Sequence, residues 1–181
     1  ITIPFVGASR DAVGYESSFG YIFDYSKSDT ISSIYFEGDF APGYGYDGGS
    51  SYNDKRYYYS FSIPSTLKAV TVTDAAQIGK GAFHKCSSIT KIVLNDGITS
   101  IGDYAFYNNP WYENLTDEFV IDGDDVLIKY NGTKSNVIIP QTVKHIAGGV
   151  FKNNTNISAV TLPDELLSIE ENAFRGCTNL T

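Results

Sequence analysis

Four segments of the chain share one pattern, in which an isoleucine is followed five residues later by a phenylalanine. They are IGKGAF at 78–83, IGDYAF at 101–106, IAGGVF at 146–151 and IEENAF at 169–174. Successive phenylalanines are 23, 45 and 23 residues apart, and 45 is one residue short of two periods. A fixed period of this length is typical of a solenoid, in which only a neighbouring coil covers the apolar face of each coil. We therefore expect a repeat solenoid, with function on its surface rather than in a pocket.

Two further features recur with the same period. Apolar triplets spaced three and then two residues apart predict one short strand of a parallel sheet per coil; they are Leu67/Val70/Val72, Ile89/Ile92/Leu94 and Ile157/Val160/Leu162. A Cys or Asn follows each phenylalanine at one fixed position, where it is expected to satisfy backbone groups at the bend; these residues are Cys86, Asn109, Asn154 and Cys177.

The segments IGKGAFHKCSSITKIVL and IEENAFRGCTNLT resemble the BspA-type leucine-rich repeat of bacterial surface proteins, over roughly residues 63–181. The resemblance implies short parallel strands joined by turns and short helical segments. It also implies an extracellular or cell-surface location and adhesion to host matrix proteins or to other cells. The opening Ile1–Pro4 matches the strand exit Val160–Pro163. We therefore interpret the chain as an excerpt of a longer solenoid that begins at the end of a preceding repeat.

Two parts of the chain depart from the repeat. Residues 1–62 form a Tyr/Gly-rich, β-type irregular segment, which we interpret as an insertion between coils or as a cap on their edge; residues 63–181 form the solenoid. Within the solenoid, an irregular repeat at about 110–140 contains two strand-like runs, Phe119–Ile121 and Val126–Tyr130. They flank Asp122-Gly123-Asp124-Asp125, whose composition favours a hairpin turn. We expect one altered coil that carries a protruding hairpin.

Tyrosine is the most informative candidate for binding, because ten of the 14 tyrosines lie in the first 62 residues. Tyrosines among glycines offer a large amphipathic contact area at low entropic cost. The alternative is that they shield the edge of the solenoid from further strand pairing. The residues we expect to form a binding surface are Tyr44, Tyr46, Tyr52, Tyr57, Tyr59, Trp111 and Tyr112.

Evidence for chemistry in the sequence is thin. His84 and His145 are the two histidines, and they lack partners at the spacing of metal ligands, so we expect surface or turn histidines. The acidic residues around Asp122 fit a turn better than a calcium loop, because the order of ligands in such a loop is missing. No nucleophile motif occurs. We expect no metal, no cofactor and no enzyme activity.

Cys86 and Cys177 occupy the same repeat position several coils apart. At about 4.8 Å per coil they are separated by about 14 to 19 Å, too far for a disulfide, which needs Cα atoms within about 7 Å. We expect two free, buried thiols.

Composition limits the partners. A net charge of -8 argues against binding to nucleic acid, and no apolar run reaches the ~20 residues of a membrane span. We expect a protein partner, such as a host matrix or surface protein, or a glycan. The hypothesis that follows is a non-enzymatic surface protein that binds proteins or mediates adhesion. The alternatives are a structural spacer of a larger surface protein and a carbohydrate-binding module.

Overall fold

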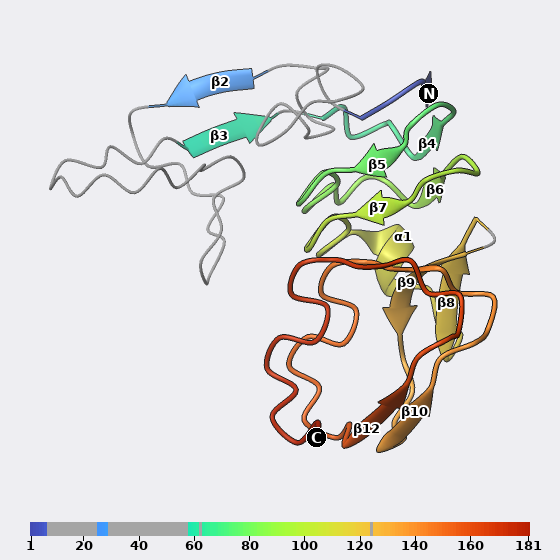
Figure 1. The fold of residues 1–181 in the computed structure, drawn as a ribbon. Helices are drawn as coiled ribbons and strands as arrows, with labels where there is room; N and C mark the ends of the chain where they lie inside the picture. Colours follow the sequence, from blue (N-terminus) through green and yellow to red (C-terminus); the bar gives the residue numbers. More distant parts are fainter. Residues whose placement is uncertain (7–24, 29–57, 62, 124) are drawn as a thin grey trace, which may run out of the picture.

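The computed structural model describes residues 1–6, 25–28, 58–61, 63–123 and 125–181, with the backbone alone for 25–28 and 58–61. It contains short strands and one helical turn, which wind into stacked coils (Figure 1). The elements are β1 (Thr2–Ile3), β2 (Tyr25–Ser28), β3 (Tyr58–Phe61), β4 (Ala69–Val72), β5 (Gln77–Ile78), β6 (Lys91–Val93), β7 (Ser100–Ile101), α1 (Pro110–Glu113), β8 (Phe119–Asp122), β9 (Val126–Tyr130), β10 (Asn136–Ile138), β11 (His145–Ile146), β12 (Ala159–Thr161) and β13 (Ser168–Ile169).

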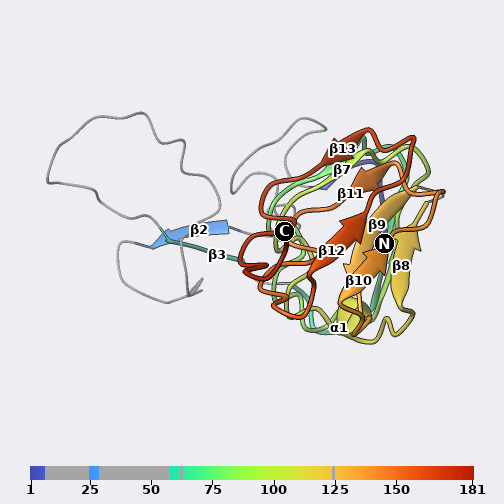
Figure 2. The same cartoon turned by 60° about the horizontal axis from the view of Figure 1, so that its bottom comes forward.

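Each regular coil contributes two short strands to two separate parallel ladders. The first ladder has the order β1-β4-β6 and continues lower in the stack as β10-β12; the second comprises β5-β7 and then β9-β11-β13. Figure 2 shows β11 and β13 side by side along one edge of the coils, with β10 and β12 along another. The pairing of Val137 with Val160, 23 residues later, confirms the period expected from the sequence.

Strand β1 belongs to the stack although it precedes the Tyr-rich segment. It pairs in parallel with β4, with Ile3 beside Val72. Among the described strands of the stack, the neighbour of β1 is therefore β4, although the Tyr-rich segment lies between them in the sequence. Within the segment between them, β2 and β3 form an antiparallel pair.

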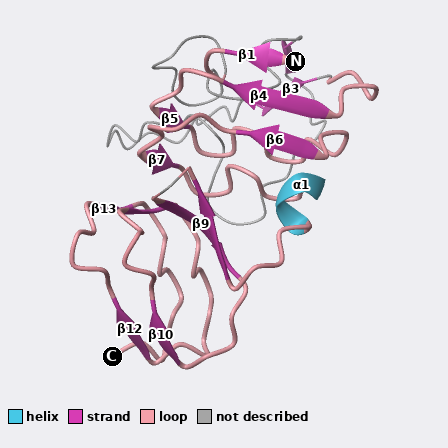
Figure 3. Cartoon of the chain, turned by 90° about the vertical axis from the view of Figure 1, so that its right-hand side faces the viewer, coloured by secondary structure: helices cyan, strands magenta, loops and turns pink. Residues whose placement is uncertain are grey.

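Both ladders are interrupted at the same level, at the irregular repeat. The described strands of the first ladder divide there into β1-β4-β6 and β10-β12, because β6 and β10 are not paired with each other. Figure 3 shows β10 and β12 steeply inclined relative to β4 and β6, so the stack changes direction at this level. We name this level, between the coil of residues 101–109 and the coil of residues 146–154, the junction.

The expected hairpin is present, but it does not protrude. Strands β8 and β9 pair antiparallel, with a register irregularity at Val120/Ile121. Strand β9 also pairs in parallel with β11, and four of its five residues are buried. Because Val126, Leu127 and Ile128 are all apolar, the strand covers core on both faces, which a protruding hairpin would not do.

The phenylalanines stack in two pairs. The rings of Phe83 and Phe106 lie 5.7 Å apart, and those of Phe151 and Phe174 lie 4.8 Å apart, both nearly parallel. Buried residues divide into two clusters, one around each pair, and Val150 packs against both. The stacking of the phenylalanines is therefore interrupted at the junction, where residues of the irregular repeat replace the missing coil.

The fixed Cys/Asn position works as expected. Asn109 is fully buried, and its amide donates to the Cys86 carbonyl at 3.3 Å. The Cys177 thiol donates to the Phe151 carbonyl at 3.0 Å. Both cysteines are free, which confirms the absence of a disulfide, but Cys177 is only half-buried because it lies in the last coil, where Phe174 is also partly exposed.

The two histidines differ from each other. His84 lies in a turn, as expected, with its ring stacked on Tyr107. The expectation of a surface or turn position is wrong for His145, which is 8 % exposed in strand β11. Its Nδ1 lies 2.9 Å from the Ser168 hydroxyl one coil away. The hydrogen bond satisfies a polar ring that would otherwise be costly to bury.

Candidate functional site

The two halves of the stack touch closely at one point of the junction. The Gly148 amide donates to the Ile101 carbonyl at 2.8 Å. A Cβ built on Gly148 would lie 2.3 Å from the backbone nitrogen of Asp103, so only glycine allows this approach. One coil earlier, Gly102 meets the backbone of Lys80 in the same way. These glycines hold the coils together at one edge.

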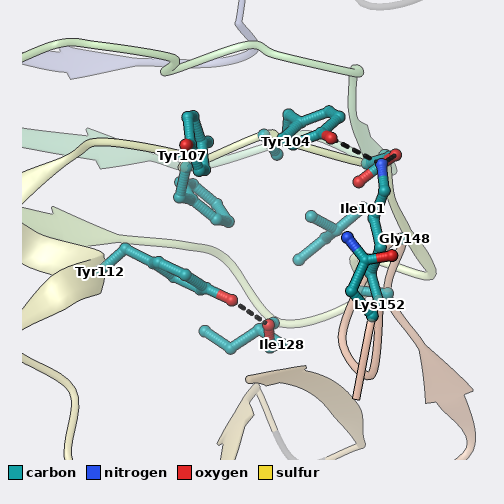
Figure 4. A pocket seen from close by; sticks show the side chains of 14 residues that line it. Ile101, Tyr104, Tyr107, Tyr112, Ile128, Gly148 and Lys152 are labelled. Atoms are coloured by element: carbon teal, nitrogen blue, oxygen red, sulfur yellow. Dashed lines mark hydrogen bonds and ion pairs between the residues drawn. The ribbon is translucent and has the colours of Figure 1, made fainter. Parts of the chain in front are cut away.

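Next to this contact the two coils line an open pocket of about 310 Å³. One wall is the turn of residues 101–107, and the other is formed by residues 147–149 with Lys152 and Asn153. Tyr112 and Ile128, from the irregular repeat, close the bottom. Figure 4 shows Tyr104 and Tyr107 on one side, Tyr112 and Ile128 opposite, and Lys152 at the edge. The pocket thus exists because the irregular repeat replaces a coil at this level.

The tyrosines of the pocket are held by other rings. Tyr107 is 47 % exposed, and its ring lies 5.4 Å from the ring of His84 and 5.3 Å from that of Tyr104. Tyr112 stacks on Phe106, and its hydroxyl donates to the Ile128 carbonyl at 3.0 Å. Burial raises the pKa of the Tyr112 phenol. Tyr107 therefore offers an exposed face that is supported by the two neighbouring rings.

An ion pair connects the two walls. The Lys152 amine donates to the Asp103 carboxylate at 2.9 Å and to the Tyr104 hydroxyl at 2.7 Å, and it lies 3.9 Å from the centre of the Tyr104 ring. Asp103 is 2 % exposed and also accepts from the Asn172 amide at 3.0 Å. Burial opposes protonation of the amine, but the hydrogen bonds to Tyr104 and Asp103 outweigh it and raise the pKa of Lys152. These hydrogen bonds therefore hold the amine in its charged form.

Of the residues expected to form a binding surface, two have described side chains. Trp111 and Tyr112 lie on α1. Asn109 caps the start of this helix, because its side-chain oxygen accepts a hydrogen bond from the Trp111 amide at 2.9 Å, and Pro110 follows in the first turn. Both are partly buried, and Trp111 packs edge-on against Phe106. Only Tyr112 also lines the pocket.

The other expected positions give no side-chain information. Tyr59 lies on β3, of which only the backbone is described. Tyr44, Tyr46, Tyr52 and Tyr57 lie outside the described residues.

Sequence reasoning missed Tyr104, Tyr107 and Lys152. The signal that could have found two of them is the position directly after each phenylalanine, which holds His84, Tyr107, Lys152 and Arg175. In a solenoid such positions form one column on the outside. The column joins aromatic and basic side chains in a chain whose net charge is -8.

Among the residues with described placement, no three His, Cys, Asp or Glu side chains are grouped in a way that could hold a metal ion. Within the same part of the chain, no helix has the length and apolar character needed to cross a membrane.

Comparison with known proteins identifies the repeat. The family model for the BspA type leucine rich repeat region matches residues 54–181 in six copies. A crystal structure of a leucine-rich cell surface protein from Faecalibacterium prausnitzii is similar, with 19 % identity and a TM-score of 0.31. The match covers 63 % of this chain and 46 % of that protein, so the chain spans less than half of its length. No curated protein matches the sequence. Because the family model covers more than half of the chain, this protein belongs to the BspA-type leucine-rich repeat family.

Proposed function

We propose that this protein is a non-enzymatic leucine-rich repeat protein of a bacterial cell surface, where it binds another protein, such as a host matrix protein or a protein of another cell. The observation that carries the proposal is the half-exposed ring of Tyr107, held between His84 and Tyr104 at the junction pocket, where the sequence led us to expect a surface without a pocket. Aromatic side chains that are rigid and partly exposed are the usual anchors of protein interfaces.

The charged groups of the pocket favour binding over catalysis. A general base or a nucleophile needs a pKa near the working pH and a free position towards the substrate. The Asp103 carboxylate is instead occupied by Lys152 and Asn172, and Lys152 is held in its charged form. These groups fix the geometry of the pocket and leave recognition to the aromatic rings.

A structural spacer is the second candidate, and one observation favours it. Backbone hydrogen bonds such as Phe83 to Ala105 and Phe151 to Ala173 join each coil only to its neighbour. Such a linear stack stiffens a stalk without any ligand. The two candidates differ in whether the pocket matters for adhesion.

The proposal is tested by measuring binding of the purified chain to arrays of matrix proteins and glycans, with Tyr107→Ala as the variant. We expect binding to at least one protein and a loss of about tenfold or more in the variant, as for an interface anchor. Ile138→Ala is the matched control, because Ile138 is 68 % exposed on β10 and does not line the pocket. Silence across the array, or equal binding by Tyr107→Ala, contradicts the proposal and favours the spacer.

A further inference from the structure

Regular turns of the stack are joined by a row of backbone hydrogen bonds. The amides of Gly81, Phe83 and Lys85 donate to carbonyls two residues apart on the next coil, at 3.1, 2.7 and 2.9 Å. Two bonds of this row recur in the second half, where Phe151 and Asn153 donate to the next coil at 2.8 and 2.7 Å, whereas the Gly149 amide, at the position of Gly81, donates to no residue in the described part of the chain. The partner of each such row is therefore a backbone that presents a carbonyl at every second residue.

At the junction this row is not paired. Tyr104 and Phe106 occupy the positions of Gly81 and Phe83 one coil later, but their amides donate to no residue in the described part of the chain. On the facing coil, the carbonyls of Gly148 and Val150 similarly accept no hydrogen bond from the described residues. Tyr104, Phe106 and Gly148 all line the pocket. The Phe106 amide at the pocket thus occupies a position that both neighbouring levels use for pairing, whereas the Tyr104 position is paired in the coil before the junction and not in the coil after it.

We propose that the junction pocket binds an extended peptide segment of the partner protein, whose backbone carbonyls accept hydrogen bonds from the amides of Tyr104 and Phe106. This rests on the proposed function and names the part of the partner that is recognised. A peptide backbone repeats its carbonyls every second residue on one side, as the next coil does elsewhere in the stack. Addition of such a segment to an unpaired backbone row is an established mode of peptide recognition.

The charges of the pocket determine which segment fits. Lys152 is paired with Asp103 at 2.9 Å, and Lys80 is paired with Glu171 at 3.8 Å. The charged groups around the site therefore largely cancel, and neither an acidic nor a basic side chain gains a new partner there. A neutral segment avoids the cost of burying an unpaired charge. Its apolar side chains can pack against the exposed ring of Tyr107.

Amide hydrogen exchange followed by NMR tests the proposal on the wild-type chain. In the free protein, the amides of Tyr104 and Phe106 should exchange at least about tenfold faster than those of Gly81 and Phe83, because only the latter are paired in the stack. Gly81 and Phe83 are matched controls, since they occupy the same repeat positions. Equal protection in the free chain overturns the proposal.

The second step adds an end-capped probe peptide with the sequence of residues 157–162, ISAVTL, which is neutral and includes the strand β12. Up to about millimolar probe should slow exchange at Tyr104 and Phe106 by about fivefold or more, as expected for backbone pairing worth about 1 kcal/mol, and leave Gly81 and Phe83 unchanged. The control is the same sequence with ester links in place of its amides, whose carbonyls are poorer acceptors. Three outcomes overturn the proposal: the peptide gives no protection, the ester probe protects the amides equally well, or glucose added in place of the peptide protects them.

These outcomes are distinguishable from failure of the proposed function. If a matrix protein binds and Tyr107→Ala weakens it, but the amides of Tyr104 and Phe106 stay unprotected in the complex, protein binding stands and peptide pairing fails. If the probe peptide protects both amides but no protein on the array binds, peptide pairing stands and the proposed function fails.

Discussion

Truncation of Phe106 to alanine is the sharpest test of how the coils pack. Phe106 is 3 % exposed, and its ring lies 5.7 Å from Phe83, 5.0 Å from Trp111 and 5.9 Å from Tyr112. A buried Phe→Ala change costs about 3 to 5 kcal/mol, and each aromatic pair adds about 0.5 to 1.5 kcal/mol to area burial. Because the substitution removes the ring that all three pairs share, we expect it to cost about 4 kcal/mol. Tyr107→Ala should cost about 1 kcal/mol, because this neighbouring ring is already 47 % exposed to water.

The measurement is urea unfolding of both variants, followed by circular dichroism and by tryptophan fluorescence. Trp111 is the single tryptophan and touches Phe106, so its emission reports on the junction itself. Agreement of the two probes checks that unfolding is two-state, as a comparison of free energies requires. Losses of equal size for Phe106→Ala and Tyr107→Ala would refute the assignment of one ring to the core and the other to the surface.

Three further predictions concern charge and thiol chemistry. Lys152→Met should lower the free energy of unfolding by about 3 kcal/mol, because it leaves the buried Asp103 carboxylate without its cation. Urea unfolding measures this loss, and adding Asp103→Asn should recover part of it. Burial lowers the pKa of His84 from 6.5 to about 4, so the unfolded chain binds the proton first as the pH falls. Its contribution to stability is complete above pH 6.5 and is lost between pH 6.5 and 4, and His84→Gln should flatten that part of the profile. Burial raises the pKa of the Cys86 thiol to about 12 and also raises the pKa of the Cys177 thiol. Because Cys86 is buried and Cys177 only half-buried, a thiol reagent at about pH 8 should label Cys177 first.

Each of these predictions has its own control. Lys134→Met removes an exposed ion pair with Glu118, at 3.0 Å, and should cost less than about 1 kcal/mol. A loss as large as that of Lys152→Met would contradict the special role of the buried pair. An unchanged pH profile in His84→Gln would show that another group carries the acid dependence. Labelling of Cys86 as fast as Cys177 in the native chain would contradict its burial.

The repeat frame was predictable because it depends on local spacing. Pairs such as Val137 with Val160 follow from one period of the sequence, and so do the stacked rings of Phe83 and Phe106. The antiparallel pairing of β8 with β9 was also predictable, because it depends on the short turn between them. These features involve residues that are near in the chain or one coil apart.

The junction was not predictable for the opposite reason. The pocket joins Tyr104 to Lys152, 48 residues later, across a level where the period is lost. The pairing of β9 with β11 depends on which strand fills the missing coil, and the apolar sequence of Val126–Tyr130 suits either a buried or a protruding strand. Burial of His145 similarly depends on Ser168 in another coil. Such relations are decided by packing between coils, which a single sequence does not record.

The division of the buried residues into two clusters has a mechanical consequence. The two clusters are joined by β8 and β9, whose side chains alternate between them, and by Val150, which packs against both. A pulling force along the stack would therefore load β8 and β9 at this level, because these strands connect the two blocks. Since Ile128 of β9 also lines the pocket, tension on this strand would change the shape of the pocket.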